Sequence, residues 1–95
     1  MTLKLTHDLF EPHVDTLFSV QADNVALELV LAKVELAGAE RDGFQPFALL
    51  FEGPEQPLLQ QQIVPLRHER LGEIALFLTH VGTREGVVVY EAVFN

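Results

Sequence analysis

Residues 74–94 read IALFLTHVGTREGVVVYEAVF. Two apolar runs, Ile74–Val81 and Val87–Phe94, lie on either side of the turn-forming segment Gly82–Gly86. Runs of this length are too short for most helices and end at turn residues, so the pattern predicts two consecutive antiparallel strands. Both runs are apolar on both faces, which predicts that each strand is covered twice. The second cover could be an N-terminal helix, a long bent strand or another subunit.

Shorter apolar runs toward the N-terminus repeat this organisation. Phe47–Phe51 and Gln60–His68 predict two more strands, and the proline-containing loop Gly53–Pro57 lies between them. Pro65 cannot donate a hydrogen bond to a strand ladder, so we expect Gln60–His68 at an edge of the sheet or at a local bulge. Asp15–Ala22 predicts the first strand of the chain.

The segment Val25–Ala37 is ambiguous. It follows Asp23-Asn24, where we expect a tight reversal because Asp and Asn tolerate positive φ. Its Ala, Leu, Glu and Lys content favours a helix, whereas its apolar alternation favours a strand. The alternation changes phase before Val34 and Leu36, and a β-bulge near Ala32-Lys33 would put these two side chains on the same face as the apolar residues before it. We therefore favour a long bent strand.

The N-terminal residues 6 to 11 are typical of the start of a helix. Thr6 can cap the first turn, and Asp8 lies near the positive end of the helix dipole. Pro12 limits the helix because the residue before a proline is disfavoured in the helical conformation. The sequence as a whole predicts a single, mainly β domain over residues 1–95. It is a small barrel or rolled sheet of six antiparallel strands, with this short helix closing one end.

The composition restricts the classes of function. The chain has 14 acidic and 6 basic side chains, for a formal net charge of −8, and 48% of its residues are hydrophobic. This charge disfavours binding to nucleic acid and to anionic membranes. The absence of cysteine excludes disulfides, thiolate catalysis and cysteine-ligated zinc. The first residues lack the apolar segment of a secretory signal, so we expect a cytoplasmic protein.

The four histidines do not predict a shared site. His7 and His13 lack a same-face helical spacing, and His68 and His80 fall at opposite ends of neighbouring strands. We therefore expect no metal site and no cofactor. For His68, we expect packing or hydrogen bonding across the turn closed by Leu71-Gly72.

The carboxylates are weak candidates for catalysis. Glu69 and Glu73 with His68 could form a small hydrolase site, but no motif supplies an oxyanion hole or a fixed nucleophile. Glu91 lies in an apolar strand, where it either faces outward or prevents edge pairing as an inward charge. The sequence therefore predicts no catalytic residues.

Three segments resemble a family of small bacterial proteins of unknown function. They are Phe47–Pro54, Leu66–Leu78 and Tyr90–Asn95, which reads YEAVFN. The resemblance spans most of the chain from Leu5. Genes of such proteins lie near those of phage-tail-collar-like proteins, so the resemblance implies an accessory or assembly role. His80 stands where similar sequences often have proline, which puts any role tied to that loop in doubt.

We therefore expect a non-enzymatic interaction or assembly protein, which associates with itself or with a protein partner. Its apolar contacts would come from Phe77, Val88, Tyr90 and Phe94, or an open strand edge would accept a strand of the partner. The alternative is a small β-barrel that holds an apolar ligand in its mouth. Seven phenylalanines in the interior would leave no room for a ligand, which favours the interaction hypothesis.

Overall fold

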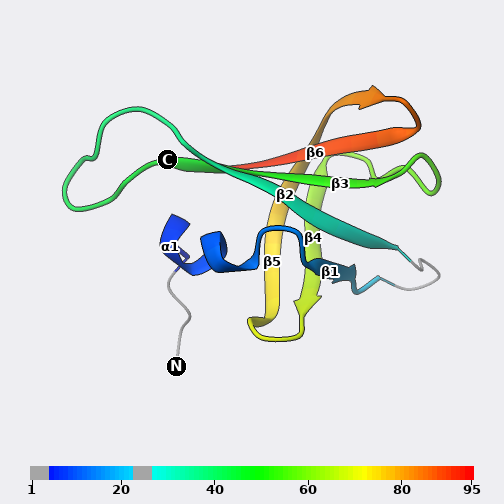
Figure 1. Ribbon diagram of the computed structural model, residues 1–95, viewed down its shortest axis with the longest axis horizontal. Helices are drawn as coiled ribbons and strands as arrows, with labels where there is room; N and C mark the ends of the chain where they lie inside the picture. Colours follow the sequence, from blue (N-terminus) through cyan, green and yellow to red (C-terminus); the bar gives the residue numbers. More distant parts are fainter. Residues whose placement is uncertain (1–4, 23–26) are drawn as a thin grey trace.

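Six antiparallel strands form a closed barrel in the spatial order β1-β2-β3-β6-β5-β4 (Figure 1). The computed structural model describes residues 5–22 and 27–95. The strands are β1 (Leu17–Val20), β2 (Glu28–Leu36), β3 (Phe47–Pro54), β4 (Gln62–His68), β5 (Gly72–Arg84) and β6 (Val87–Phe94). The predicted fold class, a mainly β barrel of six antiparallel strands with one short N-terminal helix, is confirmed. The predicted reversal at Asp23-Asn24 lies outside the described residues.

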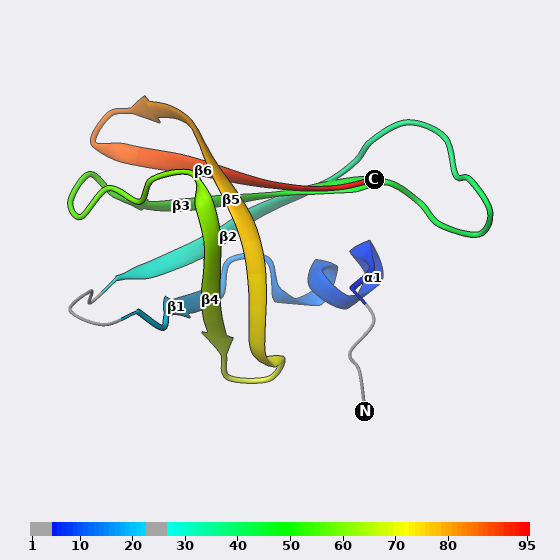
Figure 2. The same cartoon turned by 180° about the vertical axis from the view of Figure 1, so that it is seen from behind.

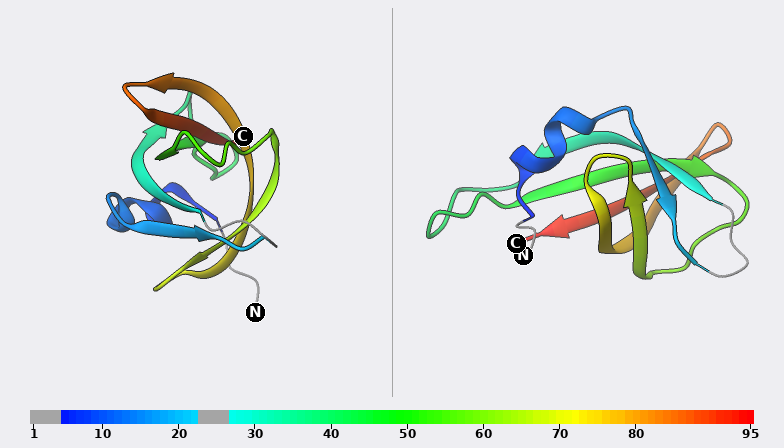
Figure 3. Two further views of the ribbon diagram at one scale, coloured as in Figure 1. Left: turned by 90° about the vertical axis from the view of Figure 1, so that its right-hand side faces the viewer. Right: turned by 90° about the horizontal axis from the view of Figure 1, so that it is seen from below.

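The long strand β5 turns the sheet into a ring. Its first part, Gly72–Leu78, pairs with β4, and its second part, Thr79–Arg84, pairs with β6. A register shift between His80 and Gly82 leaves Val81 as an extra residue, and such a bulge bends a strand. The β4–β5 hairpin consequently crosses over β3 and β6 (Figure 2), and an end-on view shows the strands curling around one interior (Figure 3).

The turn between β5 and β6 is shorter than the sequence predicts. The sequence indicates a turn over Gly82–Gly86, whereas β5 continues to Arg84. Glu85 and Gly86 alone form the turn, with φ values of 53° and 82°. Positive φ at both central positions is the geometry of a two-residue hairpin whose twist matches that of the flanking strands.

The four-residue strand β1 closes the ring. It pairs with β2 on one side and with β4 on the other, where Ser19 lies opposite Arg67. The prediction of an edge or a local bulge at Pro65 is wrong, because β4 lies between β1 and β5 and its register with β5 continues unbroken through Pro65. The backbone N–H of Gln21 donates to the Pro65 carbonyl at 2.8 Å, just beyond the last register pair of β1 and β4. An N–H at Pro65 would also face β1, because the N–H and carbonyl of one residue point to the same neighbouring strand. The hydrogen bond that proline cannot donate is therefore missing at the end of the β1–β4 ladder.

The ambiguous segment forms strand β2, as favoured from its alternation. The register with β3 shifts between Leu31 and Lys33, which makes Ala32 the predicted bulge. Beyond the bulge, Val34 packs against the core. Leu36 lies opposite the buried Phe47 and therefore shares this face, as predicted, although its side chain is 58% exposed because the strand ends there.

The N-terminal segment forms the α-helix α1 (His7–Phe10) followed by the 3₁₀ helix η1 (Glu11–His13). Asp8 lies in the first turn, at the positive end of the dipole, as predicted. The predicted cap is wrong: in the described structure the Thr6 side chain makes no capping hydrogen bond, and its carbonyl accepts from the N–H of Leu9 at 3.1 Å. Neither described helix has the length and hydrophobicity that crossing a membrane requires.

Phe10 anchors this segment at one end of the barrel. Its side chain is fully buried, and the ring centroids of Phe47 and Phe94 each lie 6.2 Å from its own. Phe47 and Phe94 in turn stack on each other, with 4.4 Å between centroids and 5° between ring planes. Aromatic contacts of this kind stabilise beyond the burial of area alone. The helix therefore closes this end of the barrel, as the sequence predicts.

Apolar side chains fill the barrel interior, because alternation along each strand sends every second residue inward. Phe18 and Phe51 meet there edge to face, with 5.3 Å between ring centroids. The largest fully buried side chains are Tyr90, Phe10, Phe18, Phe47, Phe51, Leu29, Leu31, Leu49, Leu66, Leu78, Val64 and Val88. Four of the seven phenylalanines are among them, so more than half of the phenylalanine rings lie in the interior.

Tyr90 contributes the one phenol of the chain to this interior. The backbone N–H of Leu59 donates to the Tyr90 Oη at 3.0 Å. Both residues are buried, at 1% exposed for Tyr90 and 6% for Leu59. The hydrogen bond therefore ties the segment before β4 to strand β6 without leaving either polar group unsatisfied.

We expect Tyr90→Phe to lower the free energy of unfolding by about 1–3 kcal/mol, because the buried Leu59 N–H loses its acceptor. Urea denaturation measures this loss, and amide hydrogen exchange locates it at Leu59. Wild-type stability together with an unchanged Leu59 exchange rate would contradict the assignment.

Candidate functional site

Strands β4 and β5 present an apolar surface to solvent. Ile63 and Phe77 lie opposite each other in the ladder and are 67% and 51% exposed. Pro65 and Ala75 form the next pair on the same face, and both are exposed. Large apolar side chains that meet on a solvated sheet face are typical of interaction surfaces. Strand β5 is apolar on both faces, and the described residues leave one of these faces exposed to solvent.

One ion pair borders this apolar surface. Arg67 lies opposite Glu73 in the same ladder, and its Nη2 is 3.2 Å from the Glu73 Oε2. Both side chains are mostly exposed, so the pair contributes little to stability. We call the six residues Ile63, Pro65, Arg67, Glu73, Ala75 and Phe77 the β4–β5 outer face. Its formal charge is zero, whereas the chain carries −8.

The four predicted contact residues have different positions in the structure. Phe77 lies on the β4–β5 outer face and is available to a partner. Val88 and Tyr90 are each 1% exposed, so the prediction that they contact a partner is wrong. Phe94 is half-buried, and its ring is occupied by the stack on Phe47. Because β6 is apolar on both faces, its sequence does not reveal which face points inward.

A second feature is the polar groove between the start of β1 and the β4–β5 turn. The groove is open to solvent, has a volume of about 1020 Å³ and is lined by residues that include His13, Thr16, His68 and Glu69. The rings of His13 and His68 meet edge to face, with 4.7 Å between centroids. Sequence reasoning missed this pairing, because nothing in the local pattern indicates that β1 closes on β4.

Hydrogen bonds hold the His68 ring in one tautomer. The backbone N–H groups of Arg70 and Leu71 donate to its Nδ1 at 3.0 and 3.2 Å, so this nitrogen carries no proton. The proton of the neutral ring is then on Nε2, which donates to the Thr16 Oγ1 at 2.8 Å. The Thr16 hydroxyl donates onward to the His13 carbonyl at 2.6 Å. The predicted hydrogen bonding of His68 across its turn is confirmed.

Burial lowers the pKa of His68 below its ordinary value of 6.5, and the neighbouring His13 lowers it further. The hydrogen bonds to Nδ1 act in the same direction, because protonation of Nδ1 would remove an acceptor. The His68 side chain is 4% exposed, and the folded structure favours its neutral form.

The free energy of unfolding should therefore fall as the pH drops below about 6.5, because the unfolded chain then binds a proton that folded His68 resists. Above the unfolded-state pKa this contribution is constant. Urea denaturation at a series of pH values measures the decline. His68→Asn keeps an acceptor near the Nδ1 position but does not titrate, so its decline should be smaller.

The matched control is His80→Asn, which removes an exposed imidazole that contacts the Thr83 hydroxyl. It should retain the wild-type decline. An equal decline in His68→Asn and wild type would contradict the assignment to His68.

The residues of the hydrolase hypothesis do not converge. Both ring nitrogens of His68 are engaged in hydrogen bonds within the fold. Glu73 pairs with Arg67 on the β4–β5 outer face, and Glu69 lies exposed in the turn. Glu91 alternates with the inward residues of β6, so the outward alternative is confirmed for this carboxylate.

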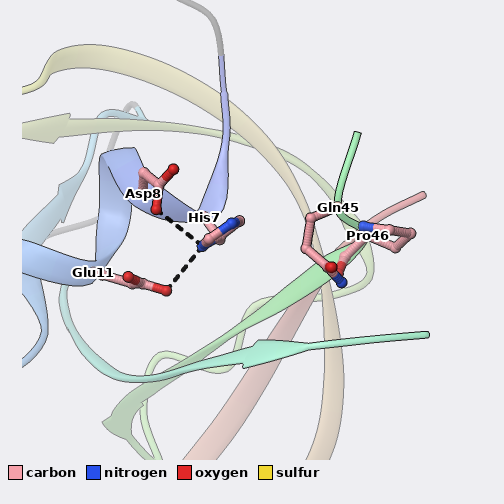
Figure 4. Close-up of polar contacts among 5 residues, drawn as sticks. All are labelled: His7, Asp8, Glu11, Gln45 and Pro46. Carbon is pink, nitrogen blue, oxygen red and sulfur yellow. Dashed lines mark hydrogen bonds and ion pairs between the residues drawn. The ribbon is translucent and has the colours of Figure 1, made fainter. Parts of the chain in front are cut away.

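A cluster of possible metal ligands lies on α1 and the first residue of η1 (Figure 4). His7 Nδ1 is 3.3 Å from the Asp8 Oδ1 and 2.9 Å from the Glu11 Oε2. The three ligand atoms lie within 4.8 Å of one another, a spacing at which they could hold a divalent cation. Both carboxylates are exposed, and their contacts with the imidazole account for the arrangement without an ion. The Gln45 amide nearby donates to the carbonyl of Pro46 at 2.8 Å.

The sequence model of one protein family, described as a domain of unknown function (DUF6916), matches residues 5–94. The chain belongs to this family. The DUF6916 match includes all six strands and the N-terminal helix, which confirms the resemblance to a family of unknown function. Its bacterial and phage-tail setting stays a prediction. Comparison with the curated proteins found no match, and comparison with the solved structures found none either.

Proposed function

We propose that this DUF6916 domain is a non-enzymatic interaction protein that binds a protein partner through the β4–β5 outer face. The observation that carries the proposal is the exposed cross-strand pair of Ile63 and Phe77. Because the strands already fix the backbone, a partner that covers these two side chains restricts only their own rotamers. The finer role that we propose is that of an accessory component of a larger, phage-tail-like assembly.

The filled interior supports this proposal over the ligand-binding alternative. Phe18, Phe51 and Tyr90 occupy the centre of the barrel at 1% exposure or less. An apolar ligand in the barrel would have to displace such side chains, at the cost of the packing that stabilises the fold. The groove beside His68 is open to solvent and nine of its twelve lining residues are polar or charged, whereas sites for apolar ligands are concave and mostly lined by apolar residues.

We expect Phe77→Asp to reduce recovery of a partner from lysate by about tenfold or more, because it places a charge at the centre of the apolar contact. The matched control is Val93→Asp, which changes a side chain of similar exposure, 54%, on strand β6. Affinity capture with quantitative mass spectrometry compares both variants with wild type. Thermal unfolding verifies that each variant folds.

A partner that wild type and Val93→Asp both recover, and that Phe77→Asp loses, supports the proposal. Equal recovery of every captured protein, untagged copies of this chain included, by wild type and both variants would contradict the proposal, since the β4–β5 outer face would then play no part in binding.

A further inference from the structure

We infer that the occupant of the β4–β5 outer face is a second copy of this chain, packed face to face about a twofold axis that runs parallel to the strands. This inference rests on the proposed function, because it names the partner of the same surface. The two copies would form an isologous dimer, in which each presents the same six residues to the other.

The register of the hairpin makes this surface complementary to itself. Arg67 lies opposite Glu73, Pro65 opposite Ala75, and Ile63 opposite Phe77. A twofold axis along the strands places β4 of one copy over β5 of the other at the same height. Each residue therefore faces the residue that it pairs with in its own ladder, but from the other copy.

Under this symmetry the charges attract. Arg67 of each copy faces Glu73 of the other, so the dimer forms two ion pairs at one end of the interface. The existing pair within each copy has 60% and 67% exposed side chains, which leaves both groups accessible to a charge above them. An axis perpendicular to the strands would instead reverse the second hairpin and separate these charges. Charge complementarity thus selects the parallel axis.

The same symmetry makes the apolar contacts complementary. Phe77 of each copy faces Ile63 of the other, while the flat pair of Pro65 and Ala75 lets the two sheets approach. Packed sheets lie about 10 Å apart, a distance that side chains of this size fill from both sides. An apolar centre with a charged rim is the usual anatomy of a protein interface.

Overall charge further favours this face for self-association. Two chains of formal charge −8 repel each other, and the repulsion is least where the approaching surfaces are neutral. The β4–β5 outer face combines zero formal charge with Ile63, the most exposed large apolar side chain of the described residues at 67%, and with Phe77 at 51%. A partner recognised by charge would prefer the acidic remainder of the surface.

Sedimentation velocity on the purified chain tests the inference from about 1 to 500 µM, the range in which a weak homodimer becomes populated. We expect a reversible monomer–dimer equilibrium in wild type and in Val93→Asp. Phe77→Asp should be monomeric throughout. Thermal unfolding at the lowest concentration verifies that each monomer is folded.

Charge exchange tests the proposed symmetry. Arg67→Glu and Glu73→Arg should each raise the dimer Kd by about tenfold or more, because like charges then face each other twice in the dimer. The double variant Arg67→Glu/Glu73→Arg should return to within about threefold of the wild-type Kd, because both attractions are restored with the signs exchanged.

Three results would overturn the inference: a wild-type chain that stays monomeric, a dimer that survives Phe77→Asp, or a double variant as weak as the single ones. The capture experiment shows whether the proposed function fails as well. If wild type is monomeric but Phe77→Asp alone loses another protein, the interaction surface stands and its partner is a different chain. If no protein is lost, the proposed function fails too.

Discussion

The structure depends on the closure of the barrel by β1, a strand of four residues that pairs with both β2 and β4. The hydrogen bond between Thr16 and His68 lies at this seam, and the bond from Gln21 to Pro65 ends it. Closure uses the ladder groups of β1 on both sides and allows the side chains of all six strands to fill one interior. The seam also places an imidazole where only its neutral form is fully hydrogen-bonded, which links the stability of the barrel to pH.

Because side chains fill the barrel interior, other molecules can bind only to the outer surface of the barrel. The alternation that sends Val64 and Leu76 inward sends Ile63 and Phe77 outward, so the core and the β4–β5 outer face arise from the same hairpin register. On an outward-facing pair of strands, alternation would normally provide polar residues. In this DUF6916 chain, apolar residues replace them, and the next charged pair of the same ladder, Arg67 and Glu73, lies beside these apolar residues. A partner that covers the exposed apolar residues would account for this departure from the usual pattern.

The sequence was sufficient for the strands, for the bulge at Ala32 and for the hydrogen bonding of His68 across its turn, because these depend on local alternation and turn chemistry. It was insufficient where the outcome depends on contacts between distant segments. The inward orientation of Tyr90 is fixed by Leu59 and by the ring as a whole, and β6 is apolar on both faces. Pro65 has the properties of an edge residue, but it is accommodated because β1 ends opposite it.

The most direct test of which β4–β5 side chains point outward uses the two isoleucines of the chain, which lie on the same hairpin. Ile63 is 67% exposed, whereas Ile74 is 7% exposed. Labelling their δ1 methyl groups gives an NMR spectrum with two signals. In dilute protein, a soluble paramagnetic chelate should relax the Ile63 methyl strongly and leave the Ile74 methyl nearly unaffected. Equal relaxation of both methyl groups, or the reverse order, would contradict the account, because a slip of one residue in the register exchanges the two faces.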